Sequence, residues 1–294
     1  LITLWRKFPY RYWRYLHRAM PALYLLLAFH AAWLAPLDWW QQPIGWLMAA
    51  LLAGGSLASV LSLAGRVGRH RQVQGTIAAI DTPEPNITEV TLDLGQAWRG
   101  HRPGQFALVT FNKLEGSHPF TIASADGGDG RVTFLIKSLG DFTRNLAHKI
   151  RVGQPVTVEG PYGCFDTSIA KDKQVWFAGG IGVTPFLSMV RAMKSTDNRD
   201  ITLVYAIREQ DEALFLDELK AKADSLKNFK LVLLQSNQGE FARVDIMKTK
   251  LPDPLSEYDY FLCGPKPMIN GLTKDMRKEG VSKTAIHTEA FEFR

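Results

Sequence analysis

Cysteine is scarce in this chain of 294 residues, which contains only Cys164 and Cys263. Two cysteines cannot form a metal cluster or a disulfide framework, so we expect two reduced thiols. Internal repeats and low-complexity tracts are also missing, which excludes a repeat architecture. The chain begins at Leu1 without an initiator methionine, and no small-residue cleavage site follows its first aromatic and basic residues. We therefore expect an N-terminally truncated chain without a signal peptide.

Charge is nearly missing from the hairpin between two apolar runs, residues 19–37 and 44–65, where only Asp38 is charged. Each run is close to the roughly 20 residues that a membrane-spanning helix needs. Basic residues flank the pair on its outer side, at Arg6, Lys7, Arg11, Arg14 and Arg18 and at Arg66, Arg69 and Arg71. This positive-inside pattern predicts two antiparallel membrane helices, with both flanks and everything after residue 71 in the cytoplasm.

The second apolar run carries a face of small residues, Gly54, Gly55, Ser56, Ala58 and Ser59. Small residues let membrane helices approach closely, so we expect the hairpin to be part of a larger bundle. Tryptophans gather around the hairpin, where an interfacial belt belongs, at Trp33, Trp39, Trp40 and Trp46. A hydrophobic hairpin buried in a soluble domain is the alternative. The net charge of +6 is concentrated on the flanks, so we expect no nucleic-acid partner.

Two histidines, His17 and His30, lie at the mouth of the first apolar run and inside it. An ionisable side chain at membrane depth is costly and usually marks a functional site. Thirteen residues of helix rise about 20 Å, which suits two haems stacked across a hydrocarbon layer of about 30 Å. On an ideal helix the two side chains are about 140° apart around the axis. A kink at Pro21 would have to reset this phase.

From residue 72 the sequence pattern changes to short strands. Alternating or β-branched segments, separated by Gly, Pro and Asn, predict five or six strands and one helix at about 141–150. Together they predict a small antiparallel barrel over residues 72–168. After Lys173 strands alternate with helices, which predicts an α/β domain with a parallel sheet over residues 169–294. The expected fold is therefore multidomain, with a transmembrane helical hairpin over residues 1–71 preceding these two domains.

A glycine loop follows the first strand of the α/β domain and opens a helix. It is formed by Gly179, Gly180 and Gly182, followed by Thr184 and Pro185. Glycines at this place let backbone amides approach a pyrophosphate, and the helix N-terminus favours its negative charge. Pro185 suits the first turn of that helix. A plain tight turn is the alternative for this loop taken alone.

Five further motifs follow in a fixed order around this loop. They are HPFT at 118–121, GxxT at 140–143, GPYG at 160–163, CGP at 263–265 and a closing Glu289-Ala290-Phe291. In this order the chain resembles the ferredoxin–NADP reductase superfamily. With the aromatic and basic lead-in at 10–17 and the two spaced histidines, it resembles the ferric reductase and NADPH oxidase membrane family.

The resemblance implies the cofactors FAD, NADPH or NADH, and two haems b in the intact protein. It implies an FAD site formed by His118, Pro119, Phe120, Thr121, Lys137, Gly140 and Thr143. It implies an NAD(P)H site formed by Gly179, Gly180, Gly182, Thr184, Pro185, Arg208, Cys263, Gly264 and Pro265. Each haem iron would take one ligand from His17 or His30. The second ligands would come from N-terminal helices that this chain lacks.

The resemblance also implies a role for three residues in the reaction. Thr121 would lie near the flavin ring, and Cys263 would shape the pocket for hydride transfer without acting as a nucleophile. Phe291, or else Phe293, would cover the flavin face and give way to the nicotinamide. Taken singly, Thr121 could equally be a solvated strand residue, Arg208 a solvated loop residue and Cys263 an inert core residue.

The leading hypothesis is a multi-pass membrane oxidoreductase. It would pass electrons from cytoplasmic NAD(P)H through FAD and two haems to an extracytoplasmic acceptor, either ferric chelate or dioxygen. A haem-free flavin reductase, anchored to the lipid bilayer and serving a soluble or quinone acceptor, is the first alternative. A nucleotide-sensing module without turnover is the second.

Overall fold

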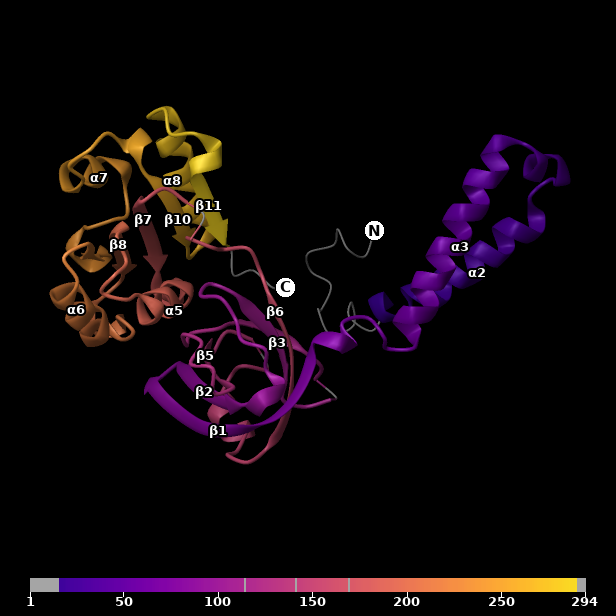
Figure 1. Cartoon of the computed structure of the whole chain (residues 1–294), viewed down its shortest axis with the longest axis horizontal. Coiled ribbons are helices and arrows are strands. Elements are labelled where there is room, and N and C mark those ends of the chain that lie inside the picture. The colour runs from indigo at the N-terminus through magenta and orange to yellow at the C-terminus, as the bar shows by residue number, and fades with distance from the viewer. Residues whose placement is uncertain (1–15, 114, 141, 169, 290–294) are drawn as a thin grey trace. The chain divides into compact units, whose positions relative to one another are not determined.

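The computed structural model describes residues 16–113, 115–140, 142–168 and 170–289. The chain divides into two compact units between Arg71 and Gln72 (Figure 1). The first unit is helical, and the second contains both β-sheets. The predicted change of sequence pattern at residue 72 therefore coincides with a change of architecture.

The first unit is a pair of apolar helices joined by a short turn. Its elements are α2 (Met20–Leu34), η1 (Leu37–Gln41), α3 (Pro43–Leu63) and η2 (Arg69–Arg71). A proline lies in the first turn of each long helix, where its fixed φ is compatible with the helix and its missing N–H costs nothing. Among the described residues only α3 is long and apolar enough to cross a membrane, and α2 is apolar but has 15 residues.

The small-residue face of α3 packs in part against α2. The Tyr24 hydroxyl donates a hydrogen bond to the Leu51 carbonyl over 3.0 Å, and a Cβ at Gly55 would overlap the Tyr24 ring. Ser59 is buried, whereas a Cβ at Gly54 would meet nothing within 4 Å. The predicted larger bundle is therefore not found in the described part of the chain. There the contacts of Gly55 are made within the hairpin itself.

The second unit begins with a six-stranded antiparallel sheet. Its strands are β1 (Gln72–Glu84), β2 (Ile87–Asp93), β3 (Phe106–Thr110), β4 (His118–Thr121), β5 (Arg131–Lys137) and β6 (Pro155–Tyr162). The strands lie in the order β4-β3-β6-β1-β2-β5. A bridge between Ile122 and Phe134 joins the two edges, so the sheet closes into the predicted barrel. Its interior is filled by a buried apolar cluster that includes Ile77, Val90 and Phe134.

The helix expected in the barrel at about 141–150 is present but shorter. The structure has a single helical turn there, α4 (Leu146–Lys149), preceded by Asn145 in the left-handed conformation. The Thr143 hydroxyl accepts hydrogen bonds from the backbone N–H groups of Leu139 and Gly140. A residue in the left-handed conformation cannot continue a right-handed helix, so Asn145 confines the helix to the single turn that follows it.

The remainder of the second unit is a five-stranded parallel sheet. Its strands are β7 (Lys173–Gly179), β8 (Asp200–Ile207), β9 (Phe229–Gln235), β10 (Asp259–Cys263) and β11 (Ile286–Glu289), in the order β11-β10-β7-β8-β9. The helices are α5 (Thr184–Ala192), α6 (Leu216–Ser225), α7 (Val244–Lys250) and α8 (Lys266–Lys278). The strands are buried on both faces, as expected for a parallel sheet covered by helices.

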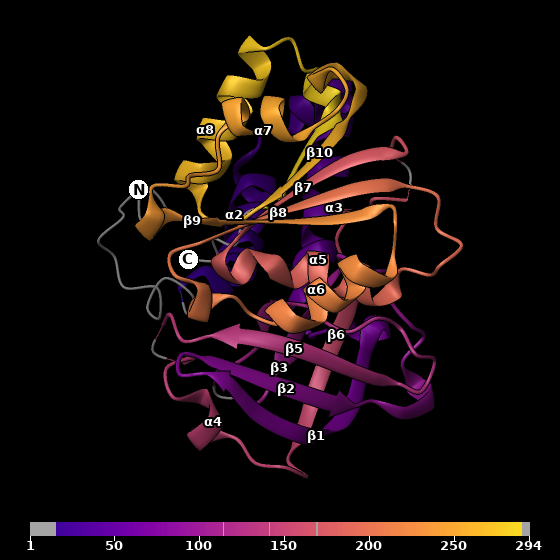
Figure 2. The same cartoon turned by 90° about the vertical axis from the view of Figure 1, so that its left-hand side faces the viewer.

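The helices are divided between the two faces of this sheet. Figures 1 and 2 show α5 and α6 on the face toward the barrel, and α7 and α8 on the opposite face. The buried cluster on the barrel side includes Ala123 and Phe165 from the preceding segments together with Phe186 and Leu219 from α5 and α6. The barrel and this face of the parallel sheet therefore share one buried apolar cluster, which is separate from the cluster inside the barrel.

Candidate functional site

The HPFT and GPYG motifs meet at one end of the barrel. Phe106 at the start of β3 pairs with Thr121 of β4 on one side and with Tyr162 of β6 on the other. The rings of Phe106 and Tyr162 are 5.9 Å apart. Residues 41 positions apart along the sequence are thus brought to either side of Phe106 by the strand order. The sequence predicted HPFT as part of the FAD site, and the register places GPYG close to it.

Thr121 places a polar atom in an apolar setting. Its side chain is buried, and its Oγ1 has no hydrogen-bond partner among the described residues. A buried hydroxyl without a partner costs about 1–3 kcal/mol, so such atoms are rare and usually meet a ligand or water. This hydroxyl fits a ring system that offers a hydrogen-bond acceptor at the end of β4.

The HPFT and GxxT motifs are joined by stacked rings. His118 and Phe142 lie 4.3 Å apart with an interplanar angle of 5°. Phe120 instead packs inside the barrel, 6.3 Å from Phe111 and 6.5 Å from Phe134. Of these predicted FAD residues, His118 contacts the GxxT turn, whereas Phe120 is also part of the barrel core.

The other predicted FAD residues are placed around this turn. The Thr143 hydroxyl accepts a hydrogen bond from the Gly140 backbone N–H, which closes the GxxT turn. Pro119 pairs with Leu108 within the β3–β4 ladder. Lys137 is exposed at the end of β5. Lys137 precedes the GxxT turn by three residues in the sequence, and its role at a diphosphate site stays a prediction.

The glycine loop packs tightly against the CGP motif at the carboxyl end of the parallel sheet. Strands β7 and β10 are neighbours, with Ala178 opposite Cys263. A Cβ at Gly182 would overlap the Cys263 carbonyl oxygen and lie 2.9 Å from the Gly264 Cα. A Cβ at Gly179 would lie 2.7 Å from Pro265. Only glycine permits this approach of two backbones, so the two predicted motifs form one structure.

Gly180 differs from its neighbours in having open space around it. Its φ is +52°, and a Cβ there would meet nothing within 4 Å. The Thr184 hydroxyl donates a hydrogen bond to the Ile181 carbonyl over 2.7 Å, which closes the turn. Pro185 follows in the first turn of α5. This arrangement leaves the tip of the loop open at the carboxyl edge of the sheet. The strand order reverses there, between β7 and β10, and parallel sheets bind dinucleotides at such a point.

Glu289 joins the site, although the sequence predicted it only as part of a closing motif. It pairs with Cys263 across β10 and β11, and its Oε2 has no hydrogen-bond partner among the described residues. Burial raises the pKa of the Glu289 carboxyl to about 7. Burial, and then the charge of Glu289, raise the pKa of the Cys263 thiol well above its usual value. The thiol is therefore protonated, in agreement with a pocket-shaping role.

The raised pKa of Glu289 predicts a pH-dependent stability. A carboxyl group whose pKa is higher in the folded state stabilises the fold fully below its usual pKa of 4.5. That contribution is lost as the pH rises through about 7, and it amounts to about 3 kcal/mol at most. The free energy of unfolding of Glu289→Gln, measured in urea, should no longer fall in this way between pH 5 and 7.5. The exposed control Glu115→Gln should retain the dependence on pH. An unchanged slope in Glu289→Gln would contradict the assignment.

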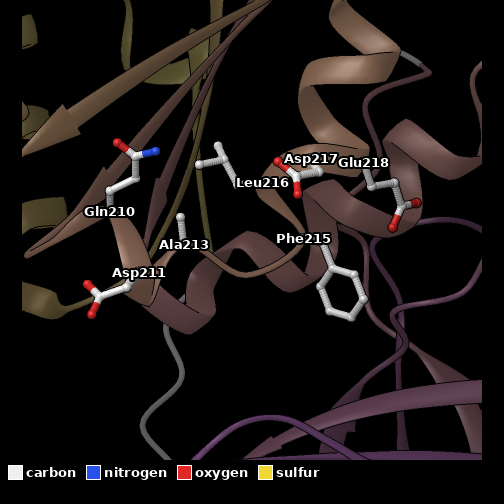
Figure 3. A pocket seen from close by; sticks show the side chains of 7 residues that line it. All are labelled: Gln210, Asp211, Ala213, Phe215, Leu216, Asp217 and Glu218. Carbon is white, nitrogen blue, oxygen red and sulfur yellow. The ribbon is translucent and has the colours of Figure 1, made fainter.

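Arg208 lies where the sequence predicted a basic residue, directly after β8. Its side chain is 73% exposed, and its Nε is 3.6 Å from Glu209 Oε1. Because Gly179 pairs with Ala206, this residue is at the same sheet edge as the glycine loop. A cavity of about 630 Å³ follows in the β8–α6 connection (Figure 3), and none of the sequence-predicted site residues lines it.

Two groups of predicted residues are not brought into a site by the described structure. His17 and His30 are both exposed in the first unit, and no described group of three or more His, Cys, Asp or Glu side chains could hold a metal ion. The predicted haem ligation is therefore unsupported by the described residues. Phe291 and Phe293 lie outside the described residues.

Comparisons with known proteins assign both halves of the second unit. Residues 72–166 match the family model of an FAD-binding domain, and residues 177–274 match that of an oxidoreductase NAD-binding domain. The reductase component of propane 2-monooxygenase from Mycolicibacterium smegmatis is 28% identical over 207 residues, which are 65% of this chain and 59% of that protein. This chain thus spans less than two thirds of that relative's length.

Two further comparisons agree with this assignment. The electron transfer component of 2-halobenzoate 1,2-dioxygenase from Burkholderia cepacia is 25% identical over 227 residues, covering 74% of this chain and 67% of that protein. The cytochrome b5 reductase domain of Ulva prolifera nitrate reductase shares the fold, with a TM-score of 0.64 and 21% identity over 74% of this chain and 97% of that chain. This chain carries an FAD-binding domain followed by an oxidoreductase NAD-binding domain, the pair of domains expected of an NAD(P)H-dependent flavoprotein oxidoreductase.

Proposed function

We propose that this chain is a membrane-attached reductase that oxidises NAD(P)H and passes the electrons to a soluble or quinone acceptor. The observation that carries the proposal is the combination, within one unit, of the unpartnered Thr121 hydroxyl and the closely packed Gly182 and Cys263 backbones. The relatives, a reductase component and an electron transfer component, support an acceptor that is itself part of an oxidation system.

The residues of the chain divide the work between the two domains. The Thr121 hydroxyl would donate to the flavin ring, and the turn closed by Thr143 would hold the FAD diphosphate. The loop at Gly180 leaves room for the NAD(P)H pyrophosphate, and Cys263 limits the nicotinamide pocket. The neighbouring Glu289 carboxyl holds or releases a proton near neutral pH. When bound, FAD supplies the conversion from two-electron to one-electron chemistry.

An anaerobic reduction experiment tests the reductase function. The full chain is purified in detergent, loaded with FAD and mixed with NADH or NADPH. We expect the flavin absorbance to bleach with at least one of the two dinucleotides, and to recover on addition of ferricyanide or a short-chain quinone. Dithionite serves as the control for reducible flavin. Bleaching by dithionite but by neither dinucleotide would instead favour a nucleotide-sensing module without turnover.

Attachment to a membrane is supported by the surface of the first unit. Large apolar side chains of α2 and α3 are exposed, among them Leu26 at 64%, Trp33 at 75% and Trp46 at 72%. Contiguous exposed apolar surface of this kind indicates contact with lipid or with a partner. Expressed in cells, the chain should remain in the membrane fraction after a high-salt and carbonate wash. Recovery in the supernatant without detergent would contradict attachment.

A second candidate function adds two haems and an acceptor across the membrane, such as ferric chelate or dioxygen. It is favoured by His30, which is an exposed ionisable residue in the apolar helix α2. A haem with two axial imidazoles needs a second ligand, and α3 contains no histidine. Membranes that contain the intact protein should show a Soret band that is weaker in His30→Ala, because that variant loses the ligand of one of the two haems. The absence of that band would leave the haem-free reductase as the function.

A further inference from the structure

Helix α5 is hydrogen-bonded to the barrel at two points. The backbone N–H of Gly104 donates to the Ser188 hydroxyl over 3.0 Å, and Arg191 Nη1 donates to the Ala123 carbonyl over 3.0 Å. Ala123 is two residues beyond Thr121, and Gly104 is two residues before Phe106, the partner of Thr121 in the β3–β4 ladder. The helix that opens at the glycine loop is therefore bonded to the barrel directly beside the predicted flavin strand.

Arg191 extends this connection to a third element. Its Nε and Nη2 each donate to a different oxygen of the Glu218 carboxylate, both over 2.8 Å. Glu218 lies on α6, whereas Ala123 belongs to the barrel. The planar guanidinium thus makes a bidentate pair on one side and a third hydrogen bond on the other. Lysine has no rigid fork of donors and cannot reproduce this geometry.

Phe215 provides an independent sign of constraint at the same place. It is a non-glycine residue with a φ of +54°, and the guanidinium of Arg191 lies 4.9 Å from its ring centroid. Such a conformation costs about 1–3 kcal/mol and persists only where the surroundings impose it. Figure 3 shows the Phe215 ring and the Glu218 carboxylate extending to the same side of the start of α6, where Arg191 contacts both.

Holding the two domains together does not require these polar contacts. The shared core already packs Ile87, Ala123 and Leu135 of the barrel against α5 and α6. Apolar packing is non-directional, whereas hydrogen bonds fix distance and angle. Glu89 of β2 is a second carboxyl group that interacts with Arg191. Burial raises the pKa of Glu89, and the positive charge of Arg191 offsets part of this rise. The hydrogen bonds of Arg191 therefore fix the geometry between the domains, whereas the apolar packing holds the domains together.

We propose that Arg191 is a positioning residue, which fixes the nicotinamide site relative to the flavin site by linking Ala123 to Glu218. This inference rests on the proposed reductase function. Hydride transfer needs the reacting atoms about 3–3.5 Å apart, and a displacement of about 1 Å can cost about 100-fold in rate. Because α5 carries both the glycine loop and Arg191, loss of the link displaces one site relative to the other.

Kinetic measurements on the full chain test the proposal. In Arg191→Met we expect the dissociation constant for NAD(P)+ to change by no more than about threefold, while the limiting rate of anaerobic flavin reduction falls by about 30- to 100-fold. In Arg191→Lys and in Glu218→Gln the limiting rate should fall by about tenfold, since each variant retains part of the link. The control is Arg277→Met, because Arg277 donates to the Val281 carbonyl entirely within the NAD-binding domain. Its reduction rate should equal that of the wild type.

A distance measurement separates this inference from the proposed function, because it needs neither cofactor nor turnover. Spin labels are placed at Arg131→Cys in the barrel and Asp224→Cys on α6, both exposed, in a Cys164→Ser background. The interdomain distance distribution should be narrow in the wild type and in Arg277→Met, and broad in Arg191→Met and Glu218→Gln. A distribution that stays narrow in both variants, or unchanged flavin reduction in Arg191→Met, would overturn the proposal. Failure of the wild type to oxidise NADH or NADPH would overturn the reductase function instead.

Discussion

Replacing Gly182 by alanine is expected to lower the limiting rate of flavin reduction by NAD(P)H by at least about 100-fold, while FAD content stays normal. The new Cβ would overlap the Cys263 carbonyl oxygen and press on the Gly264 Cα. These are backbone atoms, held by the β7–β10 ladder in which Ala178 faces Cys263. They cannot rotate away as a side chain would, so the two loops of the nicotinamide site must separate. Anaerobic stopped-flow absorbance measures the rate.

Gly271→Ala is the matched control for this substitution. Gly271 lies inside α8, and a Cβ there would meet nothing within 4 Å. Alanine is favoured over glycine in a helix by about 1 kcal/mol, so this variant should be slightly more stable and fully active. Normal flavin reduction in Gly182→Ala would show that the close approach of the two loops is not needed for the reaction.

Thr121→Val is expected to change stability and flavin reduction in opposite directions. In the apoprotein the variant removes a buried hydroxyl that has no partner among the described residues, so unfolding should become harder by about 1 kcal/mol. In the FAD-loaded protein it removes a donor placed for the flavin ring, so the limiting rate of reduction should fall by about 10- to 100-fold. Urea unfolding of the apoprotein and anaerobic reduction of the loaded protein measure the two effects separately.

Thr91→Val provides the comparison within the same barrel. The Thr91 hydroxyl is hydrogen-bonded to the Thr133 hydroxyl over 3.0 Å, so its removal breaks an existing bond. Stability should fall by about 1 kcal/mol and flavin reduction should remain normal. If Thr121→Val destabilised the apoprotein as Thr91→Val does, the Thr121 hydroxyl would have a partner within the protein and no assigned role toward FAD.

Strand periodicity predicted most of the second unit because its alternation of apolar and polar residues is strong. Strand β2 of the barrel shows this alternation, whereas β7 of the parallel sheet is a continuous apolar run that is buried on both faces. The region around Thr143 was predicted as a helix because its apolar spacing is compatible with one. Asn145 adopts the left-handed conformation and limits the helix to Leu146–Lys149, and periodicity does not reveal such an interruption.

The sequence predicted those residues of the candidate site that belong to a motif, but not the contacts between motifs. The glycine loop and Cys263 are adjacent because β7 and β10 pair, and no local pattern specifies that pairing. The same limit hid Glu289, whose importance depends on its register with Cys263 across β10 and β11. Arg191 has no motif of its own, and its function depends on contacts with segments 27 and 68 residues away.

The burial of Cys263 has a consequence for the chemical durability of such an enzyme. Flavin that meets dioxygen can generate peroxide, and peroxide oxidises thiolates far faster than thiols. Because the sulfur of Cys263 is enclosed and kept protonated, it is protected from the oxidant produced beside it. Maleimide applied to the native protein near neutral pH should therefore modify Cys164, the exposed thiol, and spare the one that shapes the nicotinamide pocket.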